Sequence, residues 1–307
     1  MSLKSIFLIL FLHASGMLVA QQRPLQSLYM FDPLLVNPAY AGNHVQLTAT
    51  AIYRNQWVNL EGAPKTFTTT IHSGFRNSRV GTGIILSNDV IGIHNDVGLY
   101  GCYSYKIPVD RTSSITFGLQ GGFNSLASDY NKLNLKTLAD PNLAGVDRKF
   151  NPNFGAGIYY RQNSFYAGFS VPYILDNKIV GLENLASVAK QKRYYYLMSG
   201  FTRKLSPNVK LVPSVLLRMQ ENAPFSFDVN AIVVLYDVVG LGTSYRFNDA
   251  VILLFELQLN DNFHVGYGYD ITTSALNQYS NGSHEIMVNY RIKIARIHKG
   301  LECPTYW

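Results

Sequence analysis

The stretch DNFHVGYGYD, ITTSALNQYSNG, SHEIMVNYRIKI, which runs over residues 261–294, decides the fold. Apolar and aromatic residues take alternate positions on both sides of a polar central loop: Phe263, Val265, Tyr267 and Tyr269 before it, and Ile286, Val288, Tyr290, Ile292 and Ile294 after it. Strict alternation of this length predicts two strands, each with one apolar and one polar side. The apolar side of this pair therefore needs an apolar environment.

The same alternation recurs from residue 44 onwards and predicts twelve further strands ahead of the final pair. The first of these carries its apolar side at Val45, Leu47, Ala49, Ala51 and Tyr53. High Tyr and Phe content (21 and 17 residues) with only 15% charged residues favours strands over helices. No internal repeat of blade length is present, which argues against a propeller. The chain is therefore predicted to be all-β, with about fourteen antiparallel strands.

The connections between the predicted strands alternate in length. Short connections follow the even-numbered strands, at residues 77–78, 108–110, 162–163, 205–207, 237 and 260–261. Long connections follow most odd-numbered strands, at residues 57–64, 88–95, 126–149, 172–191, 219–224 and 271–282, with 248–249 as the exception. Short turns at one end and long loops at the other, with an even strand count, are typical of a bacterial outer-membrane barrel. The turns, and with them both chain termini, are then expected to be periplasmic.

A barrel in lipid directs its apolar side outward and its polar side toward the lumen, because backbone groups in lipid must all be paired within a closed sheet. The polar residues expected to face inward are Arg54, His72, Gln120, Asn124, Arg161, Arg218, Asp228, Asn230, Arg246, Glu256, Gln258, His264, Glu285 and Arg291. A soluble β-sandwich would alternate too. It would not require the asymmetry of loop lengths, and no Pro/Gly/Ser linker divides the chain into two domains.

Residues 1–20 have the features of a secretory signal: Lys4 near the start, a short apolar core at 6–12, and a small residue at Ala20. That core is shorter than the roughly 20 residues that a transmembrane helix needs. The mature chain is expected to begin at Gln21. Without Lys4 the net charge falls from +7 to +6. The basic residues are scattered and the chain is exported, so nucleic acid is excluded as a partner and anionic lipid or acidic partners fit better.

Residues 21–43 form an unusual lead-in to the strands. Pro24, Pro33 and Pro38 interrupt any regular helix or strand, yet the segment is rich in apolar side chains. Two interpretations fit it equally: a plug in the interior or periplasmic mouth of the barrel, or an ordinary apolar approach to the first strand. A disulfide between Cys102 and Cys303 is compatible with export but not favoured, because the C-terminal tail would have to return to the barrel.

The sequence carries no catalytic or metal-binding motif. The histidines form no HExxH or other close pair, and no GxSxG is present. Ser283 and His284 could imitate a hydrolase site, but polar residues at a loop-to-strand junction are the simpler interpretation. Paired glycines on one strand face, as at 81–83, 155–157 and 266–268, are expected to allow close approach inside the barrel. No enzyme activity, cofactor or metal is therefore expected.

Four motifs in order resemble the PorP/SprF family of type IX secretion outer-membrane proteins: SLYMFDPLLVNPAYAG from residue 27, YRNQWVNLEGAPKTFTTTIH from 53, GAGIYY from 155, and GYGYDITTSALNQYSNGSHEIMVNY from 266. Asp32 stands where the family usually has Asn. The resemblance covers most of the mature chain. Motif residues singled out as partner-binding or structural are Tyr29, Met30, Phe31, Asn37, Pro38, Tyr40, Gly42, Trp57, Tyr269, Asp270, His284 and Glu285.

The resemblance implies a fourteen-stranded, fatty-acid-transporter-like transmembrane β-barrel at residues 44–295, after a periplasmic N-terminal segment at 21–43 and before a periplasmic tail at 296–307. It also implies a role in secreting or anchoring a protein with a type IX C-terminal signal, such as a surface adhesin used in gliding. Other type IX secretion subunits and outer-membrane lipid are further expected partners. The alternative left open is an outer-membrane channel or transporter for small hydrophobic or polar solutes.

Overall fold

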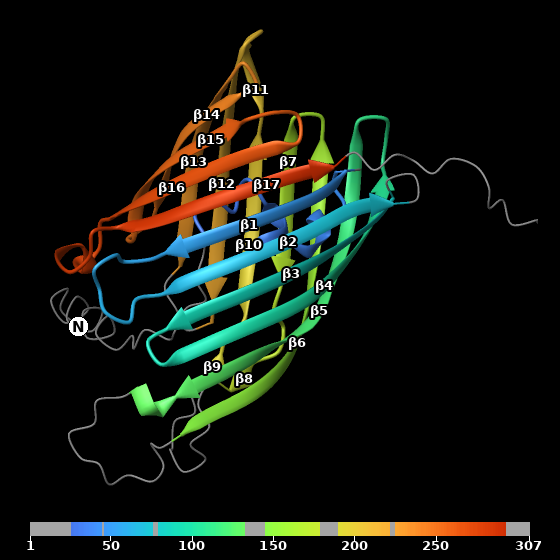
Figure 1. Ribbon diagram of the computed structural model, residues 1–307. Helices are drawn as coiled ribbons and strands as arrows, with labels where there is room; N and C mark the ends of the chain where they lie inside the picture. The colour runs from blue at the N-terminus through green and yellow to red at the C-terminus, as the bar shows by residue number, and fades with distance from the viewer. Residues whose placement is uncertain are drawn as a thin grey trace, which may run out of the picture.

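The computed structural model describes residues 26–44, 46–75, 79–132, 145–178, 190–221 and 225–292, whose strands form a closed antiparallel barrel (Figure 1). The wall comprises β1 (Leu47–Asn55), β2 (Lys65–Phe75), β3 (Val80–Ile91), β4 (His94–Pro108), β5 (Ser113–Asp129), β6 (Val146–Gln162), β7 (Phe165–Val171), β10 (Tyr194–Phe201), β11 (Arg203–Ser206), β12 (Val209–Gln220), β13 (Ser226–Leu235), β14 (Val239–Arg246), β15 (Ala250–Gln258), β16 (Phe263–Thr272) and β17 (Ser283–Ile292).

Consecutive strands pair along the chain, and two further pairings close the barrel. β1 pairs with β17 from Leu47↔Ile292 to Asn55↔His284. β10 and β11 are successive parts of one wall strand, because both pair with β12. The fifteen strands of this sheet therefore count as fourteen strands of the barrel wall. The predicted fourteen-stranded barrel is confirmed, and its final strand closes onto its first.

Burial alternates along the strands as the sequence predicts. In β1, Ile52 and Arg54 are buried while Tyr53 between them is 44% exposed. The outward side chains form an apolar belt around the barrel that includes Phe67, Ile84, Leu119, Phe169, Leu253 and Ile286. Such a belt is the lipid-facing surface of a transmembrane barrel. No helix in the described residues has the length and apolar character needed to cross a membrane.

Four strands extend beyond the predicted limits. β3 and β4 stay paired up to Ile91↔His94, so the predicted long connection at 88–95 is wrong and only residues 92–93 join the two strands. β5 and β6 stay paired up to Asp129↔Val146, so the predicted loop at 126–149 is wrong at both of its ends. The residues of β6 before Phe154 are largely polar, because wall that projects past the bilayer need not be apolar, and hydropathy therefore misses it. A small separate pair, β8 (Asn177–Lys178) and β9 (Lys190–Gln191), lies in the predicted loop at 172–191. The signal peptide, the turn at 77–78, the C-terminal tail and Cys303 lie outside the described residues.

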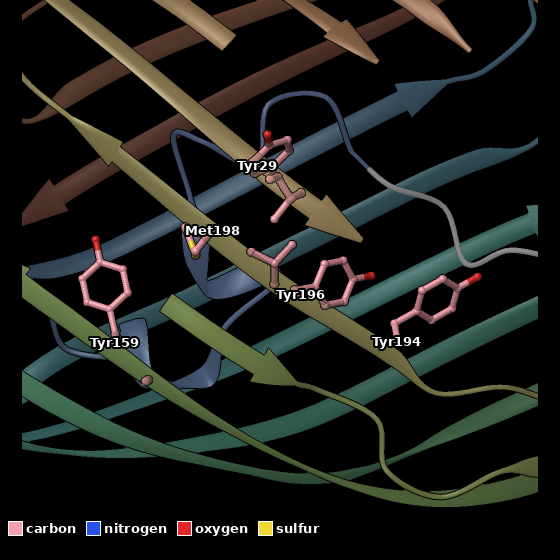
Figure 2. Packing of buried hydrophobic residues seen from close by; sticks show 8 residues of the cluster. Tyr29, Tyr159, Tyr194, Tyr196 and Met198 are labelled. Atoms are coloured by element: carbon pink, nitrogen blue, oxygen red, sulfur yellow. The ribbon is translucent and has the colours of Figure 1, made fainter. Parts of the chain in front are cut away.

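The N-terminal segment, residues 26–43, lies inside the barrel. Its prolines begin two single-turn 3-10 helices, η1 (Pro33–Leu35) and η2 (Pro38–Tyr40), since proline fixes φ and needs no donor at a helix start. Three buried clusters join the segment to different sides of the wall: Leu28 with β1, β13, β15 and β17, Leu34 with β3 and β4, and Val36 with β6, β10 and β12. Figure 2 shows Tyr29 beside Tyr196 and Met198 in the third of these.

Candidate functional site: the N-terminal segment and its seat in the barrel

A buried charged cluster on the barrel wall holds the start of the N-terminal segment. It comprises Arg54 of β1, Asp270 of β16, Glu285 of β17, Asp228 of β13 and Arg246 of β14, all with at most 2% of their surface exposed. Arg54 donates to Glu285 Oε2 at 2.8 Å through Nη1 and to Asp270 Oδ2 at 2.7 Å through Nη2. Arg246 forms a second pair with Asp228 at 3.1 Å. We refer to these five side chains as the charged seat.

The segment adds hydrogen bonds to the charged seat. The backbone amides of Ser27 and Leu28 donate to the two Glu285 carboxylate oxygens, at 2.7 and 2.8 Å. Ser27 Oγ donates to Asp270 at 2.8 Å and accepts from Arg54 at 2.9 Å. The seat has three carboxylates and two guanidinium groups, so these added donors offset part of its excess negative charge. Each hydrogen bond that a buried charge receives offsets part of its desolvation penalty, so the segment and the seat stabilise each other.

The second turn of the segment rests on glycines of the wall. Asn37 caps η2 by accepting from Ala39 N at 2.9 Å and donates to Ile158 O at 3.1 Å. A Cβ placed on Gly157 would lie 2.1 Å from Asn37 Oδ1, and one on Gly118 would lie 2.2 Å from Ala39 N. Glycine at these wall positions therefore permits backbone contact between the segment and the sheet. The predicted role of the 155–157 glycines is confirmed.

Asp32 lies between these two anchor points without a cation bonded to it. Its Oδ2 accepts a hydrogen bond from Thr70 Oγ1, while its Oδ1 is buried without a hydrogen-bond partner. Among the described residues it forms no salt bridge, although it is 2% exposed. An ionised carboxylate in such a site pays a desolvation penalty that a neutral amide of the same shape avoids.

We therefore expect Asp32→Asn to stabilise the protein by about 1 kcal/mol, because the neutral side chain keeps the acceptor for Thr70 and loses the buried charge. The measurement is the free energy of unfolding from urea titration in detergent. Asp270→Asn is the matched control: Asp270 is equally buried but paired with Arg54, so its neutralisation must destabilise. If both substitutions lowered the stability equally, the unpaired state of Asp32 would be refuted.

Nine of the twelve motif residues named from the sequence belong to the segment or to its charged seat. Asp270 and Glu285 belong to the charged seat, and the other seven lie on the segment: Tyr29, Met30, Phe31, Asn37, Pro38, Tyr40 and Gly42. The Tyr29 hydroxyl accepts from Asn230 at 2.8 Å. Gly42, at φ +66°, lies so close to Gly81 that a Cβ placed on Gly42 would be 2.4 Å from the Cα of Gly81.

The remaining motif residues, Trp57, Tyr269 and His284, lie at the base of the long loops. Trp57 N donates to Ser283 Oγ at 3.1 Å, and Tyr269 Oη donates to Asn281 O at 3.1 Å. His284 contacts the Tyr267 hydroxyl at 2.6 Å on the outer face, opposite to its neighbour Glu285. The Trp57 contact and the backbone bonds of Val58 with Asn281 and Gly282 join the loop after β1 to the loop after β16. Tyr269 and His284 lie on the outer face of their strands.

Sequence reasoning missed four participants in the seat. Ser27 opens the first motif but was not singled out, and Arg54, Asp228 and Arg246 were predicted only to face inward. Arg54 follows Tyr53 within the second motif, so its place in that motif could have identified it as a candidate site residue. The contact of Gly118 with η2 had no signal, because a single glycine in a strand carries no information about what approaches it.

Three comparisons place this geometry among known proteins. The family model described as "Type IX secretion system membrane protein PorP/SprF" matches residues 18–290. A search of curated proteins gave no match. Among solved structures, a CymD monoaromatic hydrocarbon channel is similar with 12% identity and a TM-score of 0.52, over 93% of this chain and 97% of that one. A KdgM porin (10% identity, TM-score 0.42, 80% and 99% covered) and a Pseudomonas aeruginosa FadL homologue (10%, 0.42, 80% and 89%) also match. At these identities the likeness concerns the fold alone.

Proposed function

Since the chain belongs to the PorP/SprF family of type IX secretion system membrane proteins, and is an integral outer-membrane β-barrel, we propose that it is a non-enzymatic component of that system which helps to secrete or anchor a surface protein. The proposed partner is a protein with a type IX C-terminal signal, for example an adhesin used in gliding, with other secretion subunits as further contacts. The observation that carries the proposal is the family match over nearly the whole chain.

The lumen supports a role in protein contacts over a role as an open pore. Residues 26–43 contact the wall on all sides through the three buried clusters, so the chain's own segment occupies the path that a solute would take. We propose that this segment is a plug and that the short turns lie in the periplasm. The C-terminal end of β17 then lies on the periplasmic side, while Ser27, beside the charged seat, lies toward the long loops.

Deletion of the gene tests the proposal. We expect one or a few secreted proteins to disappear from the surface proteome of the deletion strain, and plasmid-borne wild-type protein to restore them. Deletion should leave the general porins and the uptake of small solutes unchanged. A deletion strain with a normal surface proteome would refute the proposed function.

The channel alternative leads to a separate prediction. In planar bilayers the wild-type protein is expected to show no steady conductance, because the plug packs against the wall across the lumen. Removal of residues 26–36 should open a pore with a steady conductance. A variant that replaces Ser27 alone by Ala keeps the apolar contacts and should stay closed. Steady conductance of the wild-type protein would favour the channel instead.

A further inference from the structure

The lumen contains a second site, a pocket at its short-turn end that the plug leaves open. This pocket has a volume of about 320 Å³ and lies between the underside of the N-terminal segment and strands of the opposite wall. Met30 and Phe31 of the segment, with Val212, Ile232 and Val234 of β12 and β13, form an apolar floor. Tyr40, Tyr159 and Tyr166 form an aromatic side, with ring centroids 5.6 and 5.8 Å apart in successive pairs.

Three cations face the lumen at the same end of the barrel as this pocket. Lys106 of β4, Arg161 of β6 and Arg291 of β17 are on the lumenal side of their strands near the short turns, and Arg161 lines the pocket itself. None of them forms a salt bridge within the described part of the chain. We call them the mouth cations. The acidic group of the pocket is Glu256, which lies 3.6 Å from His264.

The positive charges of the three mouth cations all act on His44. His44, between the plug and β1, lines the pocket and lies 3.2 Å from the Tyr40 hydroxyl. Burial, and after it the positive charges of the three mouth cations and His72, lower the pKa of His44 to about 4. His44 is therefore neutral at pH 7. The net charge of the mouth is positive, which attracts anionic groups into a narrow opening.

We propose that this pocket binds an acidic polypeptide segment with an apolar or aromatic side chain, presented by a periplasmic partner of the secretion apparatus. The apolar floor and tyrosine side accept the apolar residue, and the mouth cations pair with carboxylates beside it. Unpaired cations at the rim of an apolar pocket provide both affinity and a faster association rate. The plug would stop a small solute that entered the pocket from crossing the barrel. A partner that binds at the pocket without crossing the barrel therefore fits the closed lumen better. This inference rests on the proposed function.

The test uses the purified full-length protein in detergent and two synthetic peptides. One alternates Asp and Phe over ten residues, and the other replaces each Asp by Lys. By calorimetry we expect the acidic peptide to bind at least tenfold more tightly than the basic one. The triple substitution Lys106→Gln, Arg161→Gln and Arg291→Gln should weaken it at least tenfold. The control, Arg79→Gln, Arg111→Gln and Arg203→Gln, removes equal charge from exposed positions at the same end and should change binding less than twofold.

A second variant tests the apolar half of the site. Val234→Trp fills the floor while all three mouth cations remain, and should also abolish binding. Each variant is first checked for the heat-dependent migration of a folded barrel. Equal binding of both peptides, or full binding by the mouth triple, would overturn the inference. So would a tenfold gain in affinity on removing residues 296–307, since the chain's own tail would then be the occupant.

The same variants in cells separate this inference from the proposed function. If gene deletion abolishes display of a surface protein and the mouth triple fails to restore it while the exposed triple does, both stand. Should the mouth triple restore full display, the pocket is not the partner site, although the secretion role survives. Normal display in the deletion strain would remove the proposed function itself.

Discussion

Replacing Arg54 by Met is expected to lower the free energy of unfolding by about 3–5 kcal/mol, which is the usual cost of removing one partner from a buried ion pair. Arg54 bonds both Glu285 and Asp270, and without it these two carboxylates remain buried with only Arg246, at 3.8 Å from Asp270, to compensate them. The loss should also release the N-terminal segment, because Arg54 donates to Ser27 Oγ. Urea titration measures the first effect, and protease cleavage within residues 26–43 measures the second.

A surface pair provides the control. Lys192 lies 3.5 Å from Asp176 and 3.7 Å from Glu221, with 29% of its side chain exposed. Lys192→Met should cost less than about 1 kcal/mol, as for other solvent-screened pairs. An Arg54→Met protein as stable as the Lys192 variant would show that the charged seat does not hold the plug.

Gly118→Ala is expected to have the second largest effect. The added Cβ would lie 2.2 Å from Ala39 N and 2.4 Å from Ala39 Cα, and both are backbone atoms that no rotamer change can move. Either β5 or η2 must shift, so we expect a loss of about 3 kcal/mol, at the upper end of overpacking costs. The plug should dissociate before the barrel unfolds, which would appear as protease cleavage of the segment at low denaturant.

Gly121→Ala in the same strand separates this clash from the effect of losing a glycine. Its Cβ would point outward and meet only the Phe154 side chain, at 3.5 Å, which is an ordinary van der Waals contact. We expect its stability to change by less than about 0.5 kcal/mol. Equal destabilisation by the two substitutions would refute the steric argument for the seating of η2.

The strands could be predicted, because their side chains follow a repeating pattern in the sequence. Single contacts between distant residues could not be predicted. Alternation in β16 and β17 gave their faces, since a period of two leaves no freedom in which side chains point inward. The same reasoning failed at Val146, where the wall continues as polar strand beyond the bilayer. Proline and apolar content left the N-terminal segment with two interpretations, because the deciding contacts lie far away in the sequence. Glu285 could be predicted to face inward, but not to bind the amides of Ser27 and Leu28.

The contacts that seat the segment also fix the order in which the molecule can assemble. The bond from Leu28 N to Glu285 joins residues 257 positions apart, and β1 closes against β17, the last strand. Contacts between such distant residues form late and slowly, because the intervening chain must first be ordered. The N-terminal segment therefore cannot bond to Glu285 until the hairpin of β16 and β17 has formed. Closing the barrel and filling its lumen become a single late kinetic step, and a chain truncated before β17 should stall in assembly with its segment unseated.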